Sequence, residues 1–200
     1  MRKPTRDRKV EILTVALGLA FEVGPDMVTT GRIAERLGLS QPAIYKHFPS
    51  KIAIWSEIAT DLGVQIKANV VRAQASEQNP VDEIRMQIRT HLELIEGAPA
   101  LPDIMVHRDL RNPQHAALDP IREAMRDFHA ALLSQVDTAQ RQGLFAREIN
   151  TGDATTLILG VIQSLVLKMM VTRQTAHLSA DGKRLLDLLL AGFSPQRSIT

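Results

Sequence analysis

Residues 29–51 constrain the fold of this chain more than any other segment, because they combine two helix starts with a glycine turn between them. Thr29 or Thr30 can cap a first short helix, since a threonine hydroxyl accepts a hydrogen bond from a free backbone N–H. Gly38 follows the last apolar position of that helix, where a left-handed backbone costs a glycine little. Ser40 is then the cap of a second short helix. The pattern predicts a helix-turn-helix.

The second short helix is predicted to carry the contacts to DNA. Gln41 lies at its start, where the amide can read a base edge, with adenine as the favoured bidentate partner. Pro42 and Ala43 are small enough to touch a thymine methyl. Tyr45, Lys46, His47 and Lys51 suit phosphate contacts, which fix position without reading sequence. The complete set of predicted DNA-binding residues is Thr29, Thr30, Arg32, Ser40, Gln41, Pro42, Ala43, Tyr45, Lys46, His47 and Lys51.

The segment also resembles the DNA-binding domain of the TetR family of bacterial transcriptional regulators. Gly24 falls where the family turns after its first helix, whereas Gly31 departs from the polar residue usual at its position. The matching residues are Thr29, Ile33, Ala34, Gly38, Ser40, Ile44, Tyr45, Lys46, His47, Phe48, Pro49, Ser50 and Lys51. The resemblance implies a DNA-binding domain over residues 1–50, with its helix-turn-helix at about 29–48. It also implies a larger helical domain over residues 51–200 that binds a small molecule and joins two subunits.

An ordinary helical bundle is the alternative interpretation of the same residues. Its two amphipathic helices would leave Lys46 and His47 simply solvated. Bundles rarely place a cap, a turn glycine, a second cap and a basic tip at these offsets, so the DNA-binding interpretation is favoured.

Charge is unevenly distributed along the chain. The formal net charge is only +2, yet residues 1–51 hold nine basic and five acidic residues, a net charge of +4, and the remainder is net −2. The positive end coincides with the helix-turn-helix, as binding to a polyanion requires. Five of the nine cations precede Val10. They form either an arm that follows DNA or an ordinary solvated tail.

Composition indicates the compartment. The chain has no cysteine, which excludes disulfides and thiol chemistry and is compatible with a reducing cytoplasm. The N-terminus is polar and basic, without the apolar core of a signal peptide. The most apolar stretch, residues 154–171, is interrupted by Gln163, Ser164 and Lys168 and is predicted to be too short and too polar for a membrane span. We expect a cytoplasmic bacterial protein that associates with the nucleoid when bound to DNA and has no membrane partner.

The pattern of apolar residues predicts an all-α fold of about nine helices, since no alternating strand pattern and no internal repeat occurs. Trp55 is the only tryptophan and is predicted to anchor the core. Besides the two short helices, the expected helices cover about residues 6–23, 51–75, 81–96, 103–109, 119–142, 153–174 and 181–190.

The last two long helices are apolar on more than one face, which predicts burial by a partner or within the subunit's own core. A second copy of the chain is the favoured partner, because paired recognition helices read palindromic half-sites. Gly160 permits close helix approach. The predicted dimer contacts are Leu157, Val161, Leu165, Met169, Leu186 and Leu189.

Evidence for a ligand site is weaker in the sequence. Aromatic residues make up only 4% of the chain, so a stacking pocket for a polyaromatic compound is not favoured. Asp103 and His107 lie four apart, the minimum for a metal pair, but no further ligand pattern accompanies them, so no metal or cofactor is predicted. The residues expected to line an effector cavity, with ordinary core packing as the alternative, are Met86, Ile104, Met105, His107, Phe128 and Leu132.

The predicted DNA-binding module, together with the resemblance to the TetR family, implies a ligand-responsive transcriptional regulator. The expected mode is repression by a homodimer that binds a palindromic operator on double-stranded DNA and is released by a small-molecule effector. An adaptor that keeps the fold but no longer binds DNA is the alternative. An enzyme is not expected, because the chain contains no nucleophile elbow, P-loop, dinucleotide glycine pattern or paired metal motif.

Overall fold

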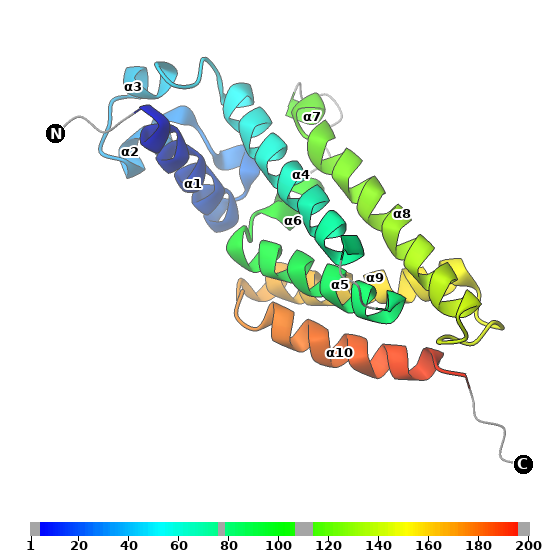
Figure 1. Cartoon of the computed structure of the whole chain (residues 1–200). Coiled ribbons are helices and arrows are strands. Elements are labelled where there is room, and N and C mark those ends of the chain that lie inside the picture. The colour runs from blue at the N-terminus through cyan, green and yellow to red at the C-terminus, as the bar shows by residue number, and fades with distance from the viewer. Residues whose placement is uncertain (1–4, 76–78, 107–113, 196–200) are drawn as a thin grey trace, which may run out of the picture. The chain divides into compact units, whose positions relative to one another are not determined.

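A computed structural model describes residues 5–75, 79–106 and 114–195, and within these ranges helices are the only regular secondary structure (Figure 1). The predicted all-α fold is confirmed. The helices are α1 (Thr5–Val23), the 3-10 helix η1 (Pro25–Met27), α2 (Thr30–Arg36), α3 (Gln41–Tyr45), α4 (Lys51–Ala75), α5 (Pro80–Gly97), α6 (Leu101–Val106), α7 (Gln114–Ala117), α8 (Asp119–Arg141), α9 (Thr151–Thr172) and α10 (Leu178–Phe193).

The chain divides into two compact units, one formed by residues 1–64 and 98–122 and the other by residues 65–97 and 123–200. Two helices, α4 and α8, contribute residues to both units. The boundary expected between residues 50 and 51 falls inside the first unit, at the start of α4.

The first unit is built on α1, which packs against η1, α2 and α6. Two glycines make its turns: Gly24, with φ of 87°, ends α1, and Gly38, with φ of 64°, separates α2 from α3. Both angles lie in the left-handed region that other residues adopt at a cost. Trp55 is buried as predicted. Further buried apolar side chains of this unit are Ile12, Ala16, Leu19, Ala20, Ile33, Ile44, Phe48, Ile54 and Ile58.

Gly63 allows a close approach of α4 to the start of α8. A Cβ built on Gly63 would lie 2.8 Å from the carbonyl oxygen of Pro120, closer than such atoms can stand. We expect Gly63→Ala to lower the free energy of unfolding by about 1–3 kcal/mol, because a backbone carbonyl must shift. Urea denaturation measures this change.

The control is Gly18→Ala on α1, where a Cβ meets nothing within 4 Å. It should stabilise the protein by about 0.5–1 kcal/mol through helix propensity. Equal effects of the two substitutions would contradict the predicted close packing.

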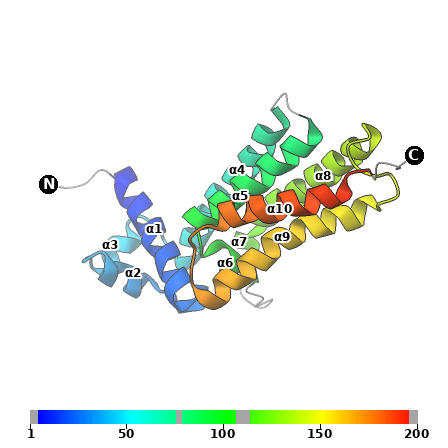
Figure 2. The ribbon, with the colours of Figure 1, turned by 90° about the horizontal axis from the view of Figure 1, so that it is seen from below.

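The second unit is organised around α10, which packs against both α5 and α9 (Figures 1 and 2). Gly182 of α10 is buried, and a Cβ at that position would overlap Leu92 of α5. Any larger residue at this position would force the Leu92 side chain to shift. The buried apolar side chains of this unit include Ile84, Ile88, Leu92, Phe128, Leu132, Ile158, Leu165, Met169, Leu186 and Leu190.

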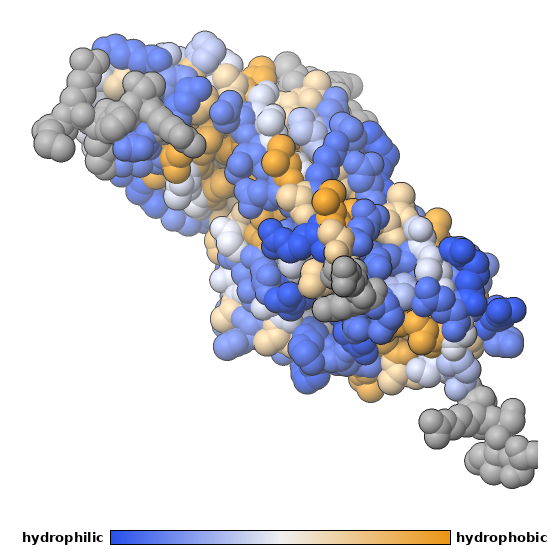
Figure 3. Space-filling model, in the orientation of Figure 1, coloured by the Kyte–Doolittle hydropathy of each residue, from blue (hydrophilic) through white to orange (hydrophobic). Residues whose placement is uncertain are grey.

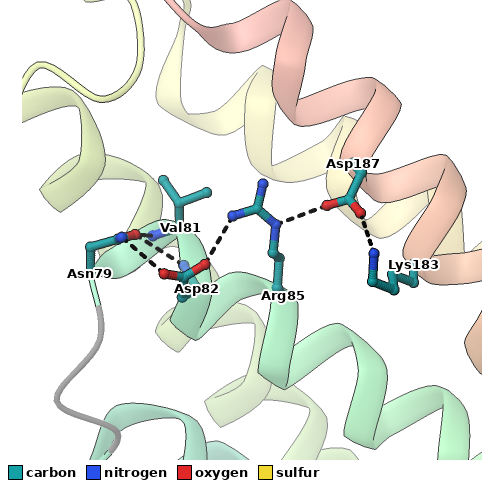
Figure 4. A network of polar contacts seen from close by, with 6 residues as sticks. All are labelled: Asn79, Val81, Asp82, Arg85, Lys183 and Asp187. Atoms are coloured by element: carbon teal, nitrogen blue, oxygen red, sulfur yellow. Dashed lines mark hydrogen bonds and ion pairs between the residues drawn. The ribbon is translucent and has the colours of Figure 1, made fainter.

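A polar network joins the N-terminal half of α5 to α10 (Figure 4). Arg85 donates from Nε to Asp187 (2.8 Å) and from Nη1 to Asp82 (2.9 Å). Lys183 donates to the other oxygen of Asp187 (2.9 Å). The hydrogen bonds from Lys183 and Arg85 lower the pKa of the Asp187 carboxyl. Asn79 caps the start of α5 by accepting hydrogen bonds from backbone N–H groups. The network orients α10 on the surface of α5.

Candidate nucleic-acid interface

The caps predicted from the sequence form the turn between α2 and α3. Thr29 accepts a hydrogen bond from the backbone N–H of Arg32 (3.1 Å) and so caps α2. The N–H of Leu39 closes the turn by donating to the carbonyl of Ala34 (2.8 Å). Ser40 has the extended backbone of a cap residue, but its hydroxyl makes no capping hydrogen bond. The helix-turn-helix geometry thus depends on Thr29 and the turn at Gly38.

Helix α3 buries an apolar side and exposes a polar one. Ile44 is fully buried, and Phe48, just after the helix, is nearly so. Gln41 and Lys46 are exposed, and Tyr45 retains 47% of its surface. Pro42 is also exposed and Ala43 is half-buried. Most of the residues predicted to contact bases or phosphates on α3 therefore lie on its accessible side.

Thr30 does not belong to this accessible side, which corrects its predicted role as a direct contact. Only 6% of its surface is exposed. Gln41 donates from Nε2 to the Thr30 hydroxyl (2.8 Å), and that hydroxyl donates to Oη of Tyr45 (3.3 Å). Thr30 therefore lies beneath α3 and holds two of its exposed side chains.

Lys51 is also placed differently from the prediction. Its ammonium donates to the backbone carbonyls of Asp26 (3.1 Å) and Pro25 (3.4 Å). Desolvation by burial lowers the pKa of Lys51, and the nearby charge of Asp26 opposes this shift. The ammonium thus attaches the start of α4 to η1, and the predicted phosphate contact is not supported in this conformation.

Other basic residues near α3 differ in their partners. Arg32 is exposed and donates to the carbonyl of Met27 (3.1 Å). Arg36 makes a bidentate pair with Glu22 (2.7 and 2.9 Å), which neutralises its charge locally. His47 is half-buried, and among the described residues its Nδ1 has no hydrogen-bond partner.

The basic N-terminus is helical from Thr5 onward, so most of the proposed arm is part of α1. Arg8 pairs with Glu11 at 2.7 Å. The Lys9 ammonium lies 5.2 Å from the ring centroid of Phe48, a cation–π contact that links α1 to the end of α3. The arm residues Arg2 and Lys3 lie outside the described part of the chain.

The predicted dimer contacts divide between core and surface. Val161, Leu165, Met169 and Leu186 are buried within the subunit, which corrects the prediction for them: their sides of α9 and α10 face the subunit's own core. Leu189 is half-buried. Leu157 is 52% exposed. The sequence could not assign each face of two helices that are apolar on more than one side.

A different set of α9 residues forms an exposed stripe. Leu157, Leu167 and Val171 are 52%, 63% and 76% exposed, and with Gly160 and Ser164 they repeat at helical spacing on one side. Leu188 of α10 is 74% exposed, and apolar surface is visible over α10 in Figure 3. We call these five α9 residues the α9 stripe: Leu157, Gly160, Ser164, Leu167 and Val171.

By length and composition alone, α9 would qualify as a membrane span, with a mean hydropathy of 1.8 over its most apolar window. Core helices of soluble proteins pass the same test, so this match does not contradict the expectation that the stretch is not a membrane span. The buried core side and the exposed stripe together explain the high hydropathy, because both are apolar.

The residues predicted to line an effector cavity are distributed over both units. Ile104 and Met105 belong to the first unit, whereas Met86, Phe128 and Leu132 belong to the second. Ile104, Phe128 and Leu132 are buried core residues, and Met86 lies in a surface groove between α5 and α10. His107 lies outside the described residues.

Sequence reasoning missed three buried polar side chains in the second unit. Gln87, His91 and Gln135 are at most 4% exposed. Within the described chain, Gln87 Oε1, His91 Nδ1 and both amide atoms of Gln135 have no hydrogen-bond partner. Gln87 donates from Nε2 to the carbonyl of Phe128 (2.8 Å), and the His91 ring lies 4.6 Å from the Phe128 ring. For Gln87 and His91 the available signal was that they interrupt the apolar stripe of α5.

The fold and the exposed α3 define an all-α protein with a helix-turn-helix module of the DNA-binding type. The sequence profile described as "Bacterial regulatory proteins, tetR family" matches residues 12–64. The profile described as "YsiA-like protein, C-terminal region" matches residues 61–192. The chain belongs to the TetR family of bacterial regulatory proteins.

Similar proteins agree with this assignment. The nucleoid occlusion factor SlmA of Vibrio vulnificus is 28% identical over 147 residues, which cover 73% of this chain and 71% of SlmA. Among solved structures, the ketosteroid regulator KstR2 of Mycobacterium tuberculosis superposes with a TM-score of 0.81 at 18% identity, covering 94% of this chain and 96% of KstR2. FadR of Bacillus subtilis, solved in complex with stearoyl-CoA, has a TM-score of 0.68 at 20% identity and covers 92% of this chain and 98% of FadR. At these identities the structural matches show the shared fold alone.

Proposed function

We propose that this protein is a cytoplasmic transcriptional repressor that binds a palindromic operator as a homodimer and is released by a small-molecule effector. The observation that carries the proposal is the accessible side of α3, where Gln41, Tyr45 and Lys46 are exposed above a buried Ile44. A polar, basic side of this kind suits major-groove binding.

The roles of the exposed side chains follow from their chemistry. Gln41 offers a carboxamide that can pair with an adenine edge, so it is the proposed base reader. Lys46 and the Tyr45 hydroxyl can contact phosphates and so set the register on the duplex. Pro42 and Ala43 remain candidates for contact with a thymine methyl.

The α9 stripe supports the proposed dimer. Its apolar residues are exposed in the single chain, while Gly160 and Ser164 in its centre are small and allow two helices to approach closely. A Cβ at Gly160 would meet nothing within 4 Å, so the subunit itself leaves space there. An isologous contact through this stripe would pair two copies of α3 for a palindromic site.

The buried polar group of the second unit supports an effector site in its core. Gln87, His91 and Gln135 present polar atoms that a bound molecule could satisfy, and leaving them unsatisfied has a cost. Burial lowers the pKa of His91 to about 4, so this imidazole is neutral at pH 7. The lining we propose is therefore uncharged. FadR, with the same fold, was solved with stearoyl-CoA, and we propose for this chain a largely apolar effector with neutral hydrogen-bonding groups.

A second candidate function follows from the relatives named nucleoid occlusion factors. In that case the chain binds DNA of the nucleoid without regulating a promoter. A third, an adaptor without DNA binding, has less support because the polar side of α3 is exposed. Neither an enzyme activity nor a cofactor is part of any of these proposals.

Selection of bound duplexes from genomic DNA tests the proposal and separates the candidates. A repressor should enrich palindromic sites close to promoters, and a nucleoid occlusion factor should enrich sites scattered over the chromosome. An adaptor should enrich none. Absence of salt-dependent binding by the folded protein would contradict both DNA-binding functions.

Lys46→Ala gives a residue-level test of the same proposal. We expect affinity to fall about 10–100-fold on every duplex, because each subunit of the homodimer loses one phosphate contact, and the salt slope to decrease by about two. Fluorescence anisotropy over a salt series measures both quantities. Arg147→Ala, which removes one exposed positive charge from the loop between α8 and α9, is the matched control and should leave both unchanged. Equal losses in the two variants would indicate a general charge effect instead.

A further inference from the structure

One buried hydroxyl connects the first and last residues of α3. Thr30 accepts a hydrogen bond from Nε2 of Gln41 (2.8 Å) and donates one to Oη of Tyr45 (3.3 Å). Thr30 is only 6% exposed, whereas Tyr45 is 47% exposed and Gln41 is exposed as well. The hydroxyl is thus shielded while the groups that it joins are accessible to a partner.

The number of hydrogens determines what each exposed group can offer. A threonine hydroxyl has one hydrogen, and the first of two possible arrangements directs it to Tyr45. Gln41 must therefore approach Thr30 with an N–H. Its second N–H and its carbonyl oxygen remain for a base edge, and this donor–acceptor pair is what adenine requires. The hydrogen of the Tyr45 hydroxyl is not consumed by Thr30, so it can be donated outward.

The opposite arrangement of the same three groups has different properties. If Tyr45 donated to Thr30, the hydrogen of Thr30 would be released from Tyr45, and Thr30 could donate it to the carbonyl oxygen of Gln41 with the amide rotated by half a turn. Tyr45 would then have no hydrogen for a phosphate, which only accepts hydrogen bonds. A phosphate oxygen at Tyr45 thus favours the arrangement in which Gln41 directs an N–H at Thr30.

We propose that Thr30 is a positioning residue that couples backbone contact at Tyr45 to base reading at Gln41. Contact between Tyr45 and a phosphate sets the direction of the shared hydrogen bonds, and Thr30 transmits that direction to the Gln41 amide. Gln41 then distinguishes adenine from the other bases most strongly when Tyr45 is in contact with a phosphate of the DNA backbone. The inference rests on the proposed DNA-binding function.

The first step identifies the base pair that Gln41 reads, as the position at which Gln41→Ala no longer distinguishes the operator base from the other bases. The experiment then compares affinities for the selected operator and for duplexes substituted at that base pair. In the otherwise unchanged protein, Tyr45→Phe should reduce the ratio of the affinities for the operator and the substituted duplex by about threefold or more. An effect of this size is typical of energetic coupling between neighbouring residues. A phosphate contact that acted alone would weaken all duplexes equally. In a Thr30→Val background, Tyr45→Phe should weaken all duplexes by the same factor. Thr30→Ser keeps the hydroxyl and should preserve the coupling.

Thermal melting and circular dichroism establish that each variant is folded. If Thr30→Val does not fold, the comparison of Tyr45→Phe with the unchanged protein, together with Thr30→Ser, still decides the question. Binding with uniform effects of Tyr45→Phe on all duplexes overturns the coupling and leaves the proposed function intact. Absence of salt-dependent duplex binding by the unchanged protein overturns the proposed function and the coupling together.

Discussion

Leu167→Arg is expected to convert the proposed dimer into a folded monomer with operator affinity reduced by about 100-fold or more, because avidity between two half-sites is lost. Leu167 is 63% exposed in the single chain, so arginine at this position should alter the stability of the subunit little. In a two-fold contact through the α9 stripe, the substitution would bury two charges without partners.

Sedimentation over a range of protein concentrations measures the assembly, and anisotropy with the selected duplex measures the affinity. Val71→Arg on α4 is the matched control, since Val71 is 62% exposed and is also aliphatic. It should remain dimeric and bind the operator normally. A dimeric Leu167→Arg variant with unchanged affinity would contradict the α9 stripe as the interface.

Phe128→Ala is expected to lower the free energy of unfolding by about 3–5 kcal/mol, as truncation of a buried aromatic ring does. Phe128 is fully buried, and its ring lies 4.6 Å from that of His91. The structure thus makes it a core residue, although the sequence suggested a cavity-lining one. Urea denaturation at constant pH measures the loss.

The neighbouring substitution His129→Ala is the control, since His129 is exposed and should change stability by less than about 0.5 kcal/mol. A loss below about 1 kcal/mol for Phe128→Ala would mean that the ring borders empty space and belongs to a ligand cavity after all.

The helices were largely predictable because their signals are local. The fourth helix was expected over residues 51–75, and α4 has these bounds. The caps and glycines around α2 and α3 act within a few residues of themselves, which is why Gly24 and Gly38 could be assigned without a structure. The short helices η1 and α7 were not predicted, since segments of three and four residues have little periodicity.

The roles of individual polar residues were harder to predict. Thr30 and Lys51 were both assigned to DNA from their position in the motif. Thr30 instead lies under α3. The Lys51 ammonium is bound to the carbonyls of residues 25 and 26, which precede Lys51 by 26 and 25 residues. Such partners are distant in sequence, so no spacing rule within a helix identifies them.

The sequence by itself determined the helical fold, the helix-turn-helix and the uneven charge, because caps, apolar periodicity and composition are properties of short segments. Only the tertiary structure decided which apolar side of α9 faces the core and which forms the exposed stripe. It also decided that Thr30 joins Gln41 to Tyr45 and that Gln87, His91 and Gln135 are buried. These properties depend on which helices pack together, and contacts between distant segments are not encoded in local spacing.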